Sequence, residues 1–187
     1  MKRVICWLGV FLFFVIFTAF AQEPPSSKSK ILLLISEQNI GMPQRSWWAS
    51  EVDLSTVEAK VANKLITSGY TVLDPSDLEK IVKQDAGFKV VGISEKKSIK
   101  LAKLANAEFV VLGKAIASSG SNVPESNMRS FFANVSAKVI RVKTGKILGY
   151  LESAGNSAHL DVVTGGKEAL AKAGEDLAEK IVGIIKK

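Results

Sequence analysis

The chain has 187 residues, of which 47% are hydrophobic and 23% are charged, and its formal net charge is +7. A chain of this length suits a single domain with a hydrophobic core of its own. One cysteine, Cys6, and one histidine, His159, exclude a disulfide framework and the common zinc ligand sets. The positive charge could favour anionic surfaces such as phospholipid headgroups, or it could simply aid solubility.

The N-terminal segment, residues 1–21, has the three parts of a secretory signal peptide. Lys2-Arg3 forms a basic start, residues 4–20 form an uncharged apolar run, and Thr18-Ala19-Phe20-Ala21 offers small residues to a signal peptidase. We therefore expect export, cleavage after this segment, and a flexible leader at residues 22–29. The alternative is an uncleaved anchor, because the apolar run is just long enough to span a bilayer.

The rest of the chain, residues 30–187, predicts one α/β domain. Residues 31–35 are a continuous apolar run, which is typical of a strand buried on both faces. A long loop is expected at residues 36–50. Ser55-Thr56-Val57-Glu58 then matches a capping box at the start of a helix that ends at Gly69, and a second strand is expected at residues 70–73.

The middle of the chain is predicted to form two helices, followed by another strand of the sheet. Asp74-Pro75 reads as the start of a short helix, and Ser94 reads as the cap of a third helix, with Asn106 as its left-handed terminator. Residues 109–117 predict another buried strand. The polar residues 118–127 are expected to form a loop.

The C-terminal third predicts a hairpin and a final helix. Apolar and polar residues alternate over residues 129–142, which indicates a strand with one solvated face. A turn at Thr144-Gly145 leads to a partner strand at residues 146–153, in which Gly149 is expected to mark a β-bulge. A helix over residues 167–185 follows. The order β-α-β-α-α-β-β-β-α predicts a mixed sheet of about five strands packed with helices.

No motif in the chain supports catalysis. Ser157 and His159 are close in sequence, but they lack the final glycine and the strand-to-helix setting of a nucleophile elbow. Thr164-Gly165-Gly166-Lys167-Glu168 lacks the spacing of a phosphate loop, and its glutamate would repel phosphate, so its glycines are interpreted as a turn. We expect no catalytic residue, no metal, no cofactor and no nucleic-acid partner.

The best candidate binding site lies in the loop after the first strand. It comprises Glu37, Gln38, Asn39, Trp47 and Trp48. Sheets of this class commonly place a binding crevice beyond the carboxyl ends of their strands, and tryptophan is favoured in binding hot spots. The two tryptophans could instead pack over the edge of the core.

The predicted third helix carries several lysines. They could contact anionic lipid or an acidic partner, or they could form an ordinary solvated helix face. The lysines are Lys96, Lys97, Lys100 and Lys103.

Several segments occur in an order that resembles a known family of bacterial envelope proteins. After the apolar first strand and its helix they are Gly69-Tyr70-Thr71-Val72-Leu73-Asp74, Leu78-Glu79-Lys80-Ile81, residues 105–113 (ANAEFVVLG) and residues 137–148 (AKVIRVKTGKIL). This set resembles the domain shared by the curli-secretion component CsgG, the middle domain of flagellar assembly protein T and the N-terminal domain of TolB. The resemblance covers about residues 30–186. It implies a periplasmic or outer-membrane-associated assembly protein that acts by binding, often in an oligomer, without catalytic residues.

Two hypotheses of function follow. The leading one is a non-enzymatic exported protein that binds envelope or appendage proteins, in curli-type or flagellar-type surface assembly or in envelope maintenance, alone or as a homo-oligomer. The alternative is a periplasmic module that binds a small ligand or peptide at the loop of residues 37–48. A flat apolar patch would favour the first, and a deep pocket beside the loop would favour the second. With the signal cleaved, membrane contact is expected to be peripheral at most.

Overall fold

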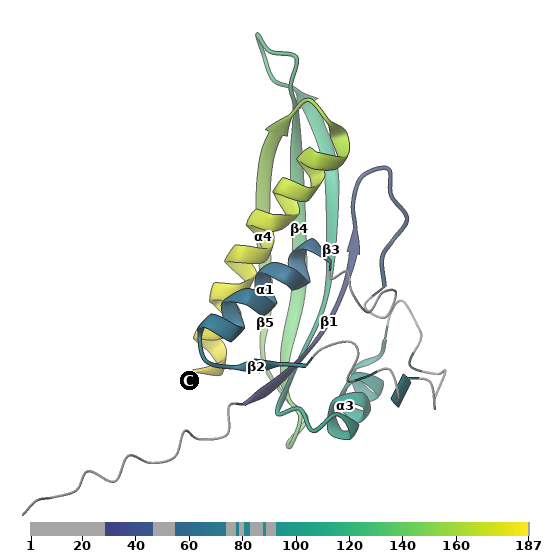
Figure 1. Cartoon of the computed structure of the whole chain (residues 1–187), viewed down its shortest axis with the longest axis vertical. Helices are drawn as coiled ribbons and strands as arrows, with labels where there is room; N and C mark the ends of the chain where they lie inside the picture. Colours follow the sequence, from purple (N-terminus) through teal and green to yellow (C-terminus); the bar gives the residue numbers. More distant parts are fainter. Residues whose placement is uncertain are drawn as a thin grey trace, which may run out of the picture.

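The computed structural model describes residues 29–46, 55–73, 78, 81–82, 88 and 93–186. These residues form a five-stranded mixed sheet in the order β2-β1-β3-β4-β5, as the sequence predicts. Strands β2, β1 and β3 are parallel, whereas β4 is antiparallel to both β3 and β5. In Figure 1, α1 and α4 lie against one face of the sheet and α3 lies near its lower end. The elements are β1 (Lys30–Gln38), α1 (Thr56–Thr67), β2 (Thr71–Val72), α3 (Glu95–Leu104), β3 (Phe109–Asn122), β4 (Arg129–Arg141), β5 (Lys146–His159) and α4 (Val162–Ile185).

Alternation along β1 divides the core into two layers. Ile31 and Ile35 pack with α1 and α4, whereas Leu32 and Leu34 pack on the opposite face with residues of α3. Successive side chains of a strand point to opposite faces, so a strand between two helical layers must be apolar throughout. Strand β4 instead alternates between buried and exposed residues over most of its length. The continuous apolar run of β1 and the alternating pattern of β4 therefore correctly predicted which faces of these strands are buried.

The predicted caps at Ser55, Gly69 and Asn106 and the predicted bulge are confirmed. The Ser55 hydroxyl accepts a hydrogen bond from the Glu58 N–H (3.1 Å), and the Glu58 carboxylate accepts one from the Ser55 N–H (3.4 Å). Asn106 and Gly69 have φ angles of 54° and 93°, as left-handed helix terminators require. Between β4 and β5 the pairing register shifts next to Gly149, which marks the bulge.

Three strands are longer than the sequence suggested. Strand β1 continues through Gln38, so Glu37 and Gln38 lie in the strand and not in a loop. The polar segment expected to form a loop at 118–127 instead extends β3 to Asn122, and β5 reaches His159. These predictions were wrong because pairing with a neighbouring strand stabilises an extended backbone whatever the local polarity.

The last helix begins earlier than expected, and Gly165 and Gly166 lie inside it rather than in a turn. Asp161 is its N-cap and accepts a hydrogen bond from the Thr164 N–H (2.7 Å). A Cβ atom at Gly165 would overlap the ring of Phe131 in β4. The glycines are therefore required by close packing of α4 on the sheet and not by a chain reversal.

Several predicted segments fall outside the described residues. They include the signal peptide, most of the leader, and the predicted helix start at Asp74-Pro75; the described residues Leu78, Ile81 and Val82 beyond it are helical. None of the helices in the described ranges is both long enough and apolar enough to cross a membrane.

Candidate functional site

A short closed loop follows β1. The backbones of Glu37 and Arg45 pair in an antiparallel bridge, with hydrogen bonds of 3.0 Å from the Glu37 N–H and 2.7 Å from the Arg45 N–H. Asn39 accepts a hydrogen bond from the Ile40 N–H (2.8 Å) and donates one from Nδ2 to the Val163 carbonyl of α4 (3.0 Å). The loop is therefore held at its base by β1 and along its side by α4.

Two buried carboxylates lie between this loop and the start of α1. The Glu37 Oε2 atom accepts a hydrogen bond from the Val57 N–H (2.9 Å), and the Glu58 Oε1 atom accepts one from the Ile35 N–H (3.1 Å). Glu37 and Glu58 are only 7% and 6% exposed. Glu37 satisfies a backbone donor in the first turn of α1, where negative charge is favourable, whereas Glu58 satisfies one in β1.

Burial also changes the protonation of Glu58. Removal of its carboxyl group from water raises its pKa from 4.5 to about 7, against the opposing effect of the hydrogen bonds from Ile35 and Ser55. The nearby charge of Glu37 adds a smaller increase. Because Glu58 does not line the pocket beside the loop, we assign it a structural role.

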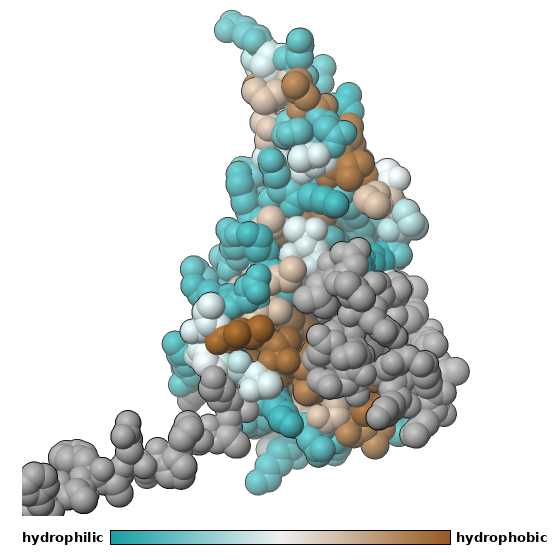
Figure 2. Space-filling view, viewed as in Figure 1, coloured by the Kyte–Doolittle hydropathy of each residue, from teal (hydrophilic) through white to brown (hydrophobic). Residues whose placement is uncertain are grey.

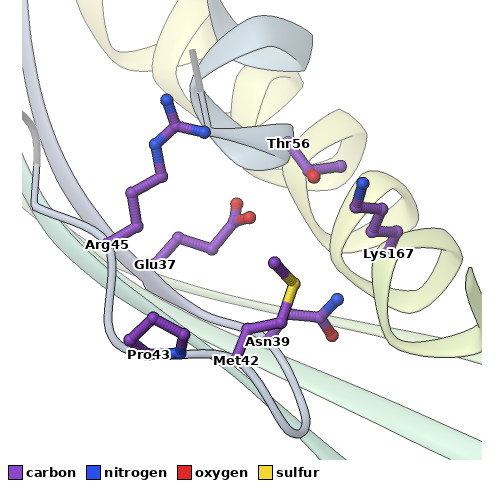
Figure 3. Close-up of a pocket in the computed structure, with 7 residues that line it drawn as sticks. All are labelled: Glu37, Asn39, Met42, Pro43, Arg45, Thr56 and Lys167. Atoms are coloured by element: carbon purple, nitrogen blue, oxygen red, sulfur yellow. The ribbon is translucent and has the colours of Figure 1, made fainter. Parts of the chain in front are cut away.

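A pocket of about 140 Å³ opens beside the loop. Figure 3 shows side chains from the loop, from the first residue of α1 and from α4 around it. Typical small-molecule pockets have volumes of roughly 300–1,000 Å³, so this one is suited to a single side chain or a small group. Its lining residues are Glu37, Asn39, Met42, Pro43, Arg45, Thr56 and Lys167.

The structure brings together only part of the predicted site. Glu37 and Asn39 line the pocket side by side. Gln38 is exposed, and as the intervening strand residue its side chain points to the opposite face of the sheet. Trp47 and Trp48 lie outside the described residues. The structure therefore places two of the five predicted residues at the pocket, and the role of the predicted site in binding stays a prediction.

Sequence reasoning missed five of the lining residues, namely Met42, Pro43, Arg45, Thr56 and Lys167. Met42, Pro43 and Arg45 lie in the segment that was singled out, but no local pattern distinguished them. Lys167 lies far away in the chain and was predicted only as the first residue of the last helix, so only the packing of α4 against the loop reveals it.

The pair Ser157 and His159 has a structural role at the junction of β5 and α4. The Ser157 hydroxyl donates to the Gly165 carbonyl (2.6 Å), and Nδ1 of His159 accepts from the Asp161 N–H (2.9 Å). The hydrogen bonds from Thr164 to Asp161 lower the pKa of that carboxyl group. No group of three or more potential metal ligands occurs among the residues that the structure describes.

The lysines of α3 lie on its exposed side. Lys96 and Lys103 are exposed, and the ammonium group of Lys100 lies 5.5 Å from the centroid of the Phe88 ring. A further lysine, Lys138 of β4, forms an ion pair with Glu95 at the start of α3 (2.8 Å). This contact joins the start of the helix to the sheet.

Two surfaces expose large apolar side chains. On the sheet face that α3 partly covers, Ile116 is 41% exposed and Phe132 is 46% exposed. On the opposite face, Figure 2 shows many hydrophilic residues, with apolar residues around β2 next to the grey residues and others near the upper end of the sheet. Ile66 of α1 is also exposed, to 55%.

No protein-family model matches the chain, and no curated protein matches it. Its fold is similar to that of several solved structures. The C-terminal domain of LpoB from Salmonella enterica has 18% sequence identity and a TM-score of 0.44, and the match covers 71% of this chain and 85% of that one. Lipoprotein GNA1162 from Neisseria meningitidis has 16% identity and a TM-score of 0.46, with 84% and 98% covered.

TolB from Acinetobacter baumannii is also similar, with 13% identity, a TM-score of 0.44, and coverage of 86% of this chain and 29% of that chain. TolB is one of the proteins that the sequence segments resemble. The resemblance to CsgG and to flagellar assembly protein T stays a prediction. With TM-scores below 0.5, none of these likenesses assigns a function.

Proposed function

We propose that this protein is an exported, non-enzymatic component of a bacterial envelope, and that it binds other envelope proteins through the loop at the end of β1. The observation that carries the proposal is a loop fixed at its base that nevertheless exposes an apolar side chain. The Glu37–Arg45 bridge and Asn39 hold the loop, while Met42 is 46% exposed.

Such a loop suits protein recognition for two physical reasons. A segment that is already ordered loses little conformational entropy when a partner docks. Methionine is flexible and polarizable, so it adapts to an apolar partner surface. Trp47 and Trp48 follow directly in the sequence, and we expect them to extend the same contact.

Site-specific cross-linking tests this function in the cell. A photo-reactive residue is placed at Met42, and separately at Ile66, an exposed apolar residue of α1 that serves as the matched control. We expect defined adducts with envelope proteins from position 42, reduced by Trp47→Ala/Trp48→Ala, and few from position 66. Equal labelling from both positions, or a folded protein with no adducts, would contradict the proposal.

The pathway served is part of the same proposal. We infer assembly of a surface structure of the curli or flagellar type, or maintenance of the envelope, from the sequence resemblance. Deletion of the gene should then alter surface structures or envelope integrity, and a Met42→Asp variant should reproduce that defect without loss of protein.

The second candidate function is binding of a small ligand or peptide group in the pocket beside the loop. Its support is the convergence of Glu37 and Lys167, which offers groups of both charges at one opening. Native mass spectrometry of the protein purified from its own envelope tests it. An adduct that is absent from Lys167→Ala would favour this function, and a bare protein mass would exclude it.

A further inference from the structure

Strand β5 forms one end of the sheet and pairs only with β4 among the described strands. It is 14 residues long. Its free edge is identified by two contacts from α4, because Lys180 Nζ donates to the Glu152 carbonyl and Lys172 Nζ donates to the Asn156 carbonyl, both over 2.8 Å. Alternate residues of a strand direct their backbone groups to the same side. Ala154, between these two, therefore also faces the open edge.

The side of α4 next to this edge carries charges of alternating sign. Four residues spaced four apart lie along it: Glu168, Lys172, Asp176 and Lys180. Residues at this spacing form one stripe on a helix. The contacts that hold α4 on α1 come from other residues, since Glu175 pairs with Lys60 and Glu179 pairs with Lys64.

The order of charges along the stripe is complementary to that of the same stripe running in the opposite direction. If two copies of α4 lie antiparallel about a two-fold axis between Lys172 and Asp176, Glu168 faces Lys180 of the second copy and Lys172 faces its Asp176. All four contacts across the axis then join opposite charges. The parallel arrangement would instead place like charges together, so the sequence of signs selects the antiparallel one.

The same two-fold axis is also compatible with pairing of the two β5 strands. Lys172 lies beside Asn156 and Lys180 beside Glu152, so the midpoint of the helical stripe lies level with Gly155. An antiparallel pairing of two β5 strands about Gly155 places Ala154 opposite Asn156 of the second copy. A hollow of about 300 Å³ lies at this point, lined by Phe132, Ala154, Gly155, Asn156 and Lys172.

We propose that β5 and α4 form the interface of a symmetric dimer of this chain, in which the two sheets join edge to edge. The two lysines leave the edge carbonyls, and Lys180 also leaves Asp176 of its own helix (2.6 Å), to pair with carboxylates of the second copy. The carbonyls then accept N–H groups of the second β5. The backbone groups at the open edge of each β5 then form hydrogen bonds with those of the other copy, as in isologous dimers generally. This interface does not depend on the envelope partner proposed above.

A charge-swap experiment tests the dimer on the full chain, expressed from its own start and purified as the cell exports it. Sedimentation equilibrium measures the dimer dissociation constant of the wild type, Lys172→Glu and Asp176→Lys. Each variant places two pairs of like charges across the axis, so we expect dimerisation at least ~10-fold weaker. An equimolar mixture of the two variants restores all four opposite-charge contacts and should form a heterodimer with an affinity near that of the wild type.

Two further variants separate the interface from general effects. Glu175→Lys makes the same change of charge one residue away, on the side of α4 that faces α1, and it should leave dimerisation unchanged. Ala154→Pro removes an outward N–H group, which an edge strand tolerates, and it should abolish the dimer while the melting temperature of the monomer is retained.

The proposal is overturned if the lysines have the opposite role and keep other strands away from the edge. Lysines along an edge strand can also block the addition of another strand. A wild type that stays monomeric at its highest soluble concentration, or a Lys172→Glu variant that associates more strongly than the wild type, would show that these lysines guard the edge. Failure of the two variants to form a heterodimer would likewise exclude the antiparallel interface.

Discussion

The carboxylate of Glu58 accepts a hydrogen bond from the backbone N–H of Ile35 over 3.1 Å, and so joins the start of α1 to the middle of β1. Strand β2 pairs with β1 only at Lys30 and Ile31. Further along this edge, the N–H of Ile35 is satisfied by Glu58 and that of Glu37 by the returning loop. A helix cap and a loop therefore take the place of a neighbouring strand.

The raised pKa of Glu58 should make stability depend on pH. Because the folded protein holds this proton up to about pH 7 while the ordinary value is 4.5, it binds more protons than the unfolded chain between these limits. Stability should therefore fall as the pH rises from about 4.5 to 7.

A shift of this size corresponds to roughly 3 kcal/mol at most. Urea unfolding of the wild type and Glu58→Gln across this range measures the difference. The variant should lose this part of the slope, while Glu175→Gln, an exposed control, should keep it. Identical slopes for the wild type and Glu58→Gln would show that Glu58 does not titrate in this range.

The packing of α4 on the loop predicts unequal effects of two glycine substitutions. A Cβ atom at Gly166 would overlap Oδ1 of Asn39, whereas a Cβ atom at Gly183 would have no neighbour within 4 Å. Gly166→Ala should therefore destabilise the protein by roughly 1–3 kcal/mol. Gly183→Ala should stabilise it by up to ~1 kcal/mol through helix propensity. Denaturant unfolding measures the change in the free energy of unfolding for both variants. Equal changes would show that the loop moves to accommodate a methyl group at position 166 without cost.

The two serine caps should also differ. Ser55 is 2% exposed and takes part in a complete capping box. Ser94 is exposed, and its hydroxyl accepts from the Lys97 N–H at 3.4 Å. Ser55→Ala should cost about 1–2 kcal/mol of unfolding free energy, whereas Ser94→Ala should cost about 0.5 kcal/mol or less. A larger loss from Ser94→Ala would contradict the assignment of Ser55 as the more important cap.

The fate of the N-terminal segment is directly measurable. If residues 1–21 are a cleaved signal, the exported protein should begin at Gln22, with Lys2 and Arg3 removed. Intact mass spectrometry and N-terminal sequencing of the envelope fraction test this. A full-length mass in the membrane fraction would instead show that the apolar run is retained as an anchor.

The candidate site illustrates where sequence reasoning stops. Glu37 and Asn39 were predicted because they follow an apolar strand, and both line the pocket. Gln38 was included by adjacency, but the alternation of the strand directs it away. Lys167 was predicted to begin the last helix, and no local signal links it to the loop.

By itself, the sequence determined the elements whose stability is local or periodic. The capping box at Ser55, the left-handed residues Gly69 and Asn106, the alternation of β4 and the bulge near Gly149 all depend on side chains within a few residues of one another.

The tertiary structure alone decided how far the strands extend and where the last helix begins. Residues up to Asn122 in β3 and His159 in β5 are extended because β4 offers them backbone partners, despite their polar character. Gly165 and Gly166 are helical because their missing side chains admit Phe131 and Asn39. Pairing and close packing join residues that are distant in the chain, so no local pattern encodes them, and they assemble both the pocket and the β5–α4 edge.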